Sequence, residues 1–241
     1  MINGILSVLR TGCSWRQMPH DLPNGKTVYH YFRRWQRDGT WERAMTSLRR
    51  EVRAHMGRDP EPSAAIIDSQ SIKTSPVRGS ERGFDAGKKN SRAQADVLVD
   101  TQGLLLAVKV HTARLMDRLG APLLLQDLGG CFPRLCHLFA DSGYTDSLIE
   151  WIKTTLGWDT EIVPKADPLI LINGELVRSP AKGFLVQLHR WKIERTFGWF
   201  IRFRRLARDY ESLPQCSEAF IQIASIQLFL RRLTPFQSFS F

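Results

Sequence analysis

The chain has 241 residues, with 34 Lys and Arg against 24 Asp and Glu, and 43% of its residues are hydrophobic. This length fits one large domain, or one domain with a small appendage, and the hydrophobic share excludes general disorder. No apolar run approaches the roughly 20 residues that span a bilayer. Met1 opens no secretory signal, and the four cysteines form no disulfide framework, so we expect a protein of the reducing cytosol.

Basic residues concentrate at the two ends of the chain. Residues 1–62 hold 11 basic and 6 acidic residues, and residues 181–241 hold 10 and 4, whereas residues 63–180 hold 13 and 14. A near-neutral middle between two basic flanks indicates a central machinery held against a polyanion. A solvated surface that favours arginine is the simpler alternative.

Residues 1–58 predict a helical N-terminal region that binds DNA. Apolar residues recur at helical spacing up to Thr11-Gly12, and two further helices are expected over Thr27–Arg37 and Trp41–His55, with Asp38-Gly39 between them. Two arginine-rich helices joined by a glycine-containing turn fit a DNA-reading helix-turn-helix. They fit equally well an ordinary helical bundle whose arginines face water.

After the Pro-rich linker at residues 59–62, the pattern changes to alternating strands and helices. Strands are expected over Ala64–Ile72, Val97–Asp100, Leu104–Thr112, Leu135–Ala140 and Glu161–Val163, with helices over Asp117–Leu128, Asp146–Leu156, His189–Ala207 and Ser217–Leu233. Ser75–Asn90 and Pro164–Gly183 predict loops. Residues 63–241 therefore predict an α/β domain with a mixed sheet flanked by helices.

Three carboxylates stand out by position. Asp68 lies inside an apolar strand, Asp141 ends another strand just before a glycine turn, and Glu194 lies on an aromatic-rich helix among cations. Carboxylate oxygens are the ligands that Mg²⁺ and Mn²⁺ prefer. Two such ions, about 3.5–4 Å apart, activate an attacking hydroxyl and stabilise the leaving oxygen of a phosphodiester.

Each carboxylate also has a simpler explanation. Asp68 fits a hydrogen-bond acceptor for backbone groups, and Asp141 fits an Asx-turn residue before Gly143. Glu194 fits a surface ion pair, because it follows Arg190 by four residues on a helix. The sequence alone leaves these alternatives open.

Several motifs resemble the signatures of DDE transposases of bacterial insertion sequences, most closely the insertion-sequence-five family. They are Ile-Asp-Ser-Gln-Ser around Asp68, Ala-Asp-Ser-Gly-Tyr around Asp141, and the run Arg190–Trp199 around Glu194. Residues 10–15, 27–35 and 38–43 also resemble that family's N-terminal helices, so the likeness covers nearly the whole chain. The run around Glu194 is the most specific of these motifs.

The resemblance implies a fold, a reaction and partners. It implies an RNase H-like catalytic domain in which Asp68, Asp141 and Glu194 bind Mg²⁺ or Mn²⁺, two ions in all, and are the catalytic residues. The implied activity is cleavage and transfer of DNA strands by a homo-oligomer bound to the element's terminal inverted repeats and to target DNA. No membrane partner is expected, and the location implied is the bacterial cytoplasm, in association with the nucleoid.

Basic residues beside these motifs are the candidates for DNA contact. Between His189 and Arg208 seven basic residues accompany one acidic residue, Glu194. The predicted DNA-binding residues are Lys88, Lys89, Arg190, Lys192, Arg195, Arg202, Arg204 and Arg205. Arg190 also matches a family position beside the glutamate, whereas Trp191, Phe197, Trp199 and Phe203 are expected to pack in the core rather than to stack on bases.

The chain departs from the family in four places. Gln187 stands where a tyrosine is expected, and Pro164–Gly183 is longer than usual, as an insertion before the glutamate helix would make it. Residues 90–96 read Asn-Ser-Arg-Ala-Gln-Ala-Asp where relatives carry a strongly basic run ending in histidine. Relatives also carry a further segment before the position of Met1, so recognition of the element's ends is expected to suffer. These departures keep two rivals open: a DNA-binding remnant without catalysis, and a metal-dependent nuclease without strand transfer.

Overall fold

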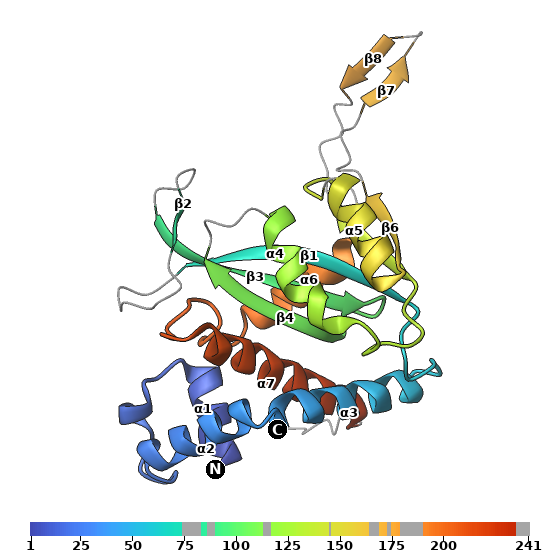
Figure 1. The fold of residues 1–241 in the computed structure, drawn as a ribbon. Coiled ribbons are helices and arrows are strands. Elements are labelled where there is room, and N and C mark those ends of the chain that lie inside the picture. The colour runs from blue at the N-terminus through green and yellow to red at the C-terminus, as the bar shows by residue number, and fades with distance from the viewer. Residues whose placement is uncertain are drawn as a thin grey trace.

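The computed structural model describes residues 1–73, 83–85, 90–112, 117–144, 146–163, 169–172, 175–178 and 190–234. Its centre is a six-stranded sheet (Figure 1). The strands are β1 (Ala64–Lys73), β2 (Gly83–Asp85), β3 (Asn90–Asp100), β4 (Leu105–Thr112), β5 (His137–Asp141) and β6 (Asp159–Val163). Their order is β2-β3-β1-β5-β6, with β4 also paired to β3. Strands β1, β3 and β4 run antiparallel, whereas β1, β5 and β6 run parallel, which confirms the mixed sheet.

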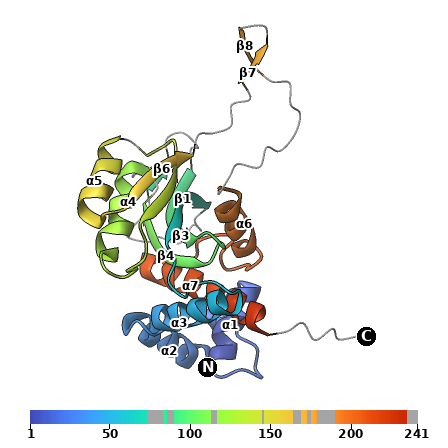
Figure 2. The same ribbon diagram turned by 90° about the vertical axis from the view of Figure 1, so that its right-hand side faces the viewer.

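Helices cover both faces of the sheet. Helices α4 (Asp117–Leu125) and α5 (Asp146–Leu156) lie on one face, and α6 (Arg190–Phe200) and α7 (Pro214–Leu233) lie on the other (Figure 2). Because side chains alternate along a strand, β1 contributes side chains to the hydrophobic cores on both faces of the sheet. Ile67 packs with the α4–α5 layer, whereas Ile66 packs with the α6–α7 layer.

The N-terminal helices share the core of the α6–α7 layer. Helices α1 (Ile2–Thr11), α2 (Gly25–Arg37) and α3 (Thr40–His55) pack against α7 on the side away from the sheet (Figures 1 and 2), with the short 3-10 helix η1 (Trp15–Gln17) between α1 and α2. The rings of Phe32 in α2 and Phe220 in α7 stack with centroids 4.6 Å apart. One hydrophobic core therefore runs from residues 1–58 into residues 63–241 through α7.

Helix α3 packs one side into the protein and exposes Arg43 and Arg50 on the other. Its Arg49 is fully buried and lies over the ring of Phe132, and its Arg53 is buried in an ion pair with Asp100. The helical-bundle alternative therefore describes α3, although two of its arginines point into the protein instead of facing water. Helix α2 keeps an exposed outer face that includes His30, Arg34 and Arg37.

Several segments differ from the sequence predictions. Strand β2 lies inside the loop predicted at Ser75–Asn90, and α6 ends at Phe200 instead of Ala207. Strand β3 begins at Asn90 instead of Val97, because Ala93 and Ala95 pack into the α7 side of the sheet while Asp96 is buried on the other face, 2.8 Å from His111 Nε2. Alternating alanine and polar residues do not resemble a hydrophobic strand pattern. The stretch predicted as a loop at Pro164–Gly183 contains the hairpin of β7 (Leu169–Ile172) and β8 (Glu175–Arg178), separate from the main sheet.

Candidate active site

Asp68 and Asp141 lie side by side on neighbouring parallel strands. Strand β1 pairs with β5 so that Ile66 lies opposite Phe139. Asp68 and Asp141 follow two residues further along each strand, and the period of two places them on the same face. That is the face covered by α6, because Ile66 and Phe139 pack into the same core cluster as Ile193 and Phe197 of α6.

Helix α6 places Arg190 beside Asp68, and the side chain of Glu194, which is 46% exposed, lies on the other side of Arg190. Arg190 Nη2 lies 3.8 Å from Asp68 Oδ2 and 4.0 Å from Glu194 Oε1. One guanidinium thus links the strand carboxylate to the helix carboxylate. The ion pair expected from the four-residue spacing is present, and it is part of the acidic site rather than an isolated surface contact.

Asp68 is an electrostatically perturbed carboxylate. Burial raises its pKa to about 6, since only 15% of the side chain is exposed. The Ser69 N–H, which donates to Asp68 Oδ1 at 2.8 Å, and the Arg190 charge lower this pKa, whereas the charges of Asp141 and Glu194 raise it. The two other predicted site residues therefore act on Asp68 through space.

Asp141 combines a turn with its place in the site. Its Oδ1 accepts a hydrogen bond from the Gly143 N–H at 2.8 Å, the geometry of an Asx-turn. This bond holds the carboxylate at the end of β5 and leaves the second carboxylate oxygen available. The turn therefore explains how the side chain is oriented without removing it from the site.

The donor set suits a hard divalent cation. Three carboxylates supply only oxygen ligands, and a cation would relieve the repulsion that Asp68 feels from Asp141 and Glu194. Asp68, Asp141 and Glu194 all belong to the described residues, and as they stand there neither they nor any other three Asp, Glu, His or Cys side chains of those residues form a group that could hold a metal ion. Arg190 supplies the positive charge between Asp68 and Glu194.

The turn between β3 and β4 anchors α6, a role that sequence reasoning missed. Thr196 Oγ1 donates to Gly103 O at 2.9 Å, and Arg195 Nη2 donates to Gln102 O at 2.9 Å. Gly103 has φ +76°, and a Cβ there would lie 2.8 Å from Thr196 Oγ1. The glycine turn was visible in the sequence, but nothing marked it as the docking point that sets the position of Glu194.

The predicted DNA-binding residues differ in their surroundings. Lys88 and Lys89 lie outside the described residues. Arg202 and Arg204 are exposed just after α6, and Arg190 faces the acidic site. Lys192 is half-buried, and burial together with the charge of Arg195 lowers its pKa.

Arg195 and Arg205 are engaged inside the protein. The Arg195 guanidinium lies 4.6 Å from the ring centroids of both Trp191 and Trp199. Arg205 is 9% exposed and pairs with Glu211 at 2.5 Å. These contacts give both arginines a structural role.

The aromatic residues of this region pack largely as expected. Phe197 and Phe203 are buried, whereas Trp191 and Trp199 are half-buried. The two tryptophans hold Arg195 between them, and Arg232 of α7 also lies over the Trp199 ring. Their faces are therefore occupied by cations of the chain itself.

Comparisons with known proteins relate most of the chain to transposases. Residues 59–229 match the family model of the transposase DDE domain, and residues 1–45 match a model of IS4/5-family transposases. The chain is 36% identical over 74 residues to the insertion element IS402 uncharacterized 16.2 kDa protein of Burkholderia cepacia. That alignment covers 30% of this chain and 49% of the relative, so the chain spans about half the length of the curated relative it matches. No solved structure matches the chain.

These matches and the fold agree. The sheet has the mixed antiparallel and parallel order of an RNase H-like domain, and Asp68, Asp141 and Glu194 all fall within the matched residues 59–229. None of the helices in the described ranges is both long enough and apolar enough to cross a bilayer. The chain belongs to the family of the transposase DDE domain.

Proposed function

We propose that this protein cleaves and transfers the DNA strands of an insertion element with divalent metal ions held by Asp68, Asp141 and Glu194. The observation that carries the proposal is the placement of Asp68 and Asp141 at matching positions of parallel strands, with Arg190 of α6 lying between Asp68 and the more exposed Glu194. Family membership supports DNA as the substrate. Bound Mg²⁺ or Mn²⁺ would lower the pKa of an attacking water or 3′-hydroxyl and stabilise the leaving oxygen.

The chain's own residues prepare this chemistry. Asp68 has a pKa of about 6, so it is mostly ionised near neutral pH and can act as an oxygen ligand. The Asx-turn fixes Asp141, and the docked α6 fixes Glu194. Arg190 carries a positive charge at the same place, which suits it to contact a phosphate oxygen once metal ions neutralise the carboxylates.

Metal removal tests the proposal. Purified protein with Mn²⁺ and a duplex carrying a terminal repeat should nick that duplex, and a chelator should abolish nicking while leaving DNA binding intact. Denaturing gel electrophoresis of an end-labelled strand measures cleavage, and fluorescence anisotropy measures binding. Binding without metal-dependent cleavage would favour the remnant, and nicking without joined products would favour the nuclease.

The acidic limb of the pH–rate profile should report Asp68. Protons compete with metal for this carboxylate, so at subsaturating metal the nicking rate should fall roughly tenfold per pH unit below about pH 6. The charge of Arg190 lowers the pKa of Asp68, so Arg190→Gln should move the midpoint upward by about one pH unit. The midpoint is the readout, whatever the maximal rate of the variant. A midpoint that stays in place or moves downward would remove Asp68 as the titrating group.

A further inference from the structure

The N-terminal region touches the segment that follows α6. The Arg205 N–H donates to Leu9 O at 3.1 Å, and Arg205 Nη1 donates to Cys13 O at 3.4 Å. Gly12 ends α1 with φ +74°, and a Cβ there would lie 3.2 Å from Arg204 Cβ. The end of α1 and the start of the α6–α7 connection therefore form one continuous surface.

Exposed arginines surround this contact. They are Arg10, Arg16, Arg202, Arg204 and Arg208, and we call them the arginine track. Residues 1–20 and 200–210 contain a single acidic residue, Asp209. Asp209 Oδ1 accepts hydrogen bonds from Ser217 Oγ at 2.8 Å and from the Glu211 N–H at 3.0 Å. The track is thus a positive surface, and the two carboxylates of the α6–α7 connection, Asp209 and Glu211, are engaged with the protein.

The track begins close to the acidic site. Glu194 and Phe200 are six residues apart on α6, a distance of roughly 9 Å at about 1.5 Å per residue, and Arg202 follows two residues after Phe200. Duplex DNA carries one negative charge per roughly 1.7 Å of its axis. A duplex whose phosphodiester lies at Asp68 and Glu194 therefore presents several phosphates within the span from α6 to the track.

We infer that the arginine track binds the phosphate backbone of the same duplex whose strand the acidic site cleaves. Arg10 and Arg16 of the N-terminal region extend the contact of Arg202, Arg204 and Arg208 along one flank of the DNA. Phosphate contacts of this kind fix register without reading sequence. The inference rests on the proposed function, to which it adds the DNA path and a role for residues 1–16 beside the catalytic domain.

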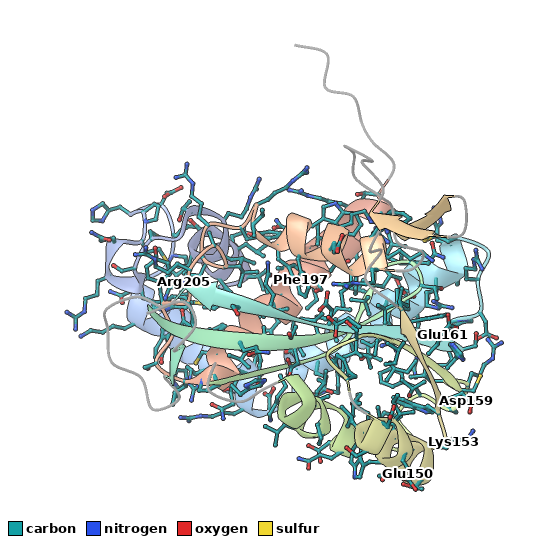
Figure 3. The ribbon with its side chains drawn as sticks, turned by 90° about the horizontal axis from the view of Figure 1, so that it is seen from above. Glu150, Lys153, Asp159, Glu161, Phe197 and Arg205 are labelled. Atoms are coloured by element: carbon teal, nitrogen blue, oxygen red, sulfur yellow. The ribbon has the colours of Figure 1, made fainter. Side chains whose placement is uncertain are left out.

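The salt dependence of binding tests the track. Affinity for a short fluorescent duplex is measured by anisotropy over a salt series without divalent metal, for the wild type and for Arg10→Gln/Arg16→Gln. The slope of log K against log salt is negative, and each lost phosphate contact reduces its magnitude by about 0.9. For the double variant the magnitude of the slope should therefore be smaller by nearly 2. Arg202→Gln/Arg204→Gln should lose a similar amount. Lys153→Gln is the matched control, because Lys153 is 55% exposed on α5 and lies far from Arg205 (Figure 3).

Every outcome separates the track from the chemistry. An unchanged slope for Arg10→Gln/Arg16→Gln overturns the track, and so does an equal loss for Lys153→Gln, which would indicate diffuse attraction to net charge. If the slopes change as predicted but no metal-dependent cleavage occurs, the result supports the track and rejects only the proposed catalysis. A wild type that binds no duplex rejects both. Circular dichroism melting of each variant confirms that all are folded, as expected for exposed side chains.

Discussion

Replacing Asp68 with Asn should abolish metal-dependent nicking and at the same time make the metal-free protein more stable. The loss of one anionic ligand from the acidic site removes several kcal/mol of transition-state stabilisation, which corresponds to a rate loss of roughly 10³-fold or more. DNA affinity should change little, because Asp68 contributes no positive charge. Gel-based nicking assays and anisotropy measure the two quantities separately.

The gain in stability follows from the raised pKa of Asp68. Folding moves this pKa from 3.8 to about 6, so the folded protein binds the proton more tightly than the unfolded chain does. The metal-free wild type therefore loses stability as pH rises from about 4 to above 6, by up to about 3 kcal/mol. Asp68→Asn escapes this penalty, although the lost attraction to Arg190 offsets part of the gain.

Urea unfolding at two pH values measures the effect. At pH 8 the Asn variant should exceed the wild type by about 1–3 kcal/mol, whereas at pH 4 the two should nearly coincide. Glu150→Gln, an exposed change on α5, should leave both nicking and stability unchanged. Equal nicking by Asp68→Asn and wild type would remove Asp68 from the catalytic set, and equal stability at pH 8 would remove the burial argument.

Arg205→Met should destabilise the protein by about 3–5 kcal/mol, the cost of leaving one partner of a buried ion pair uncompensated. Both side chains of the Arg205–Glu211 pair are 9% exposed, and burial raises the pKa of Glu211 while Arg205 lowers it. The same guanidinium lies over the rings of Tyr210 and Phe220. Its loss therefore weakens the junction of α1, the α6–α7 connection and α7.

Urea unfolding monitored by tryptophan fluorescence gives the free energy of unfolding. Arg204→Met is the matched control, because the neighbouring arginine is exposed and should change stability by less than about 0.5 kcal/mol. Glu211→Gln should fall between the two, since it keeps a hydrogen-bond acceptor but leaves the arginine charge buried. A small effect of Arg205→Met would return this residue to the surface role that the sequence suggested.

The elements with strong periodicity could be predicted from the sequence. Helix α5 and the ends of α1 and α3 follow apolar spacing and capping residues, and the apolar run of β1 is plain. The first residues of β3 could not be predicted from the sequence. Gln94 and Asp96 are buried because β3 pairs with β1 and β4, and neither partner can be read from the local pattern. The local sequence pattern does not indicate which strands will pair.

The sequence motifs located the residues of the candidate site but did not predict how these residues are arranged. The order of Asp68, Asp141 and Glu194 came from resemblance, whereas the parallel register that sets the first two side by side needed the sheet. The charge of the sequence does not distinguish buried from exposed arginines after Glu194. Tertiary contacts alone distinguish Arg205, which pairs with Glu211, from Arg204, which stays exposed.

The shared core also has a consequence for synthesis of the chain on the ribosome. Helices α1 to α3 are made first, but the surface they bury against belongs to α7, which begins only at Pro214. Until α7 has emerged, Phe32 and its neighbours have no Phe220 to cover them. We therefore expect the nascent N-terminal region to depend on chaperones, and chains that terminate before α7 to be degraded rather than to persist as separate DNA-binding fragments.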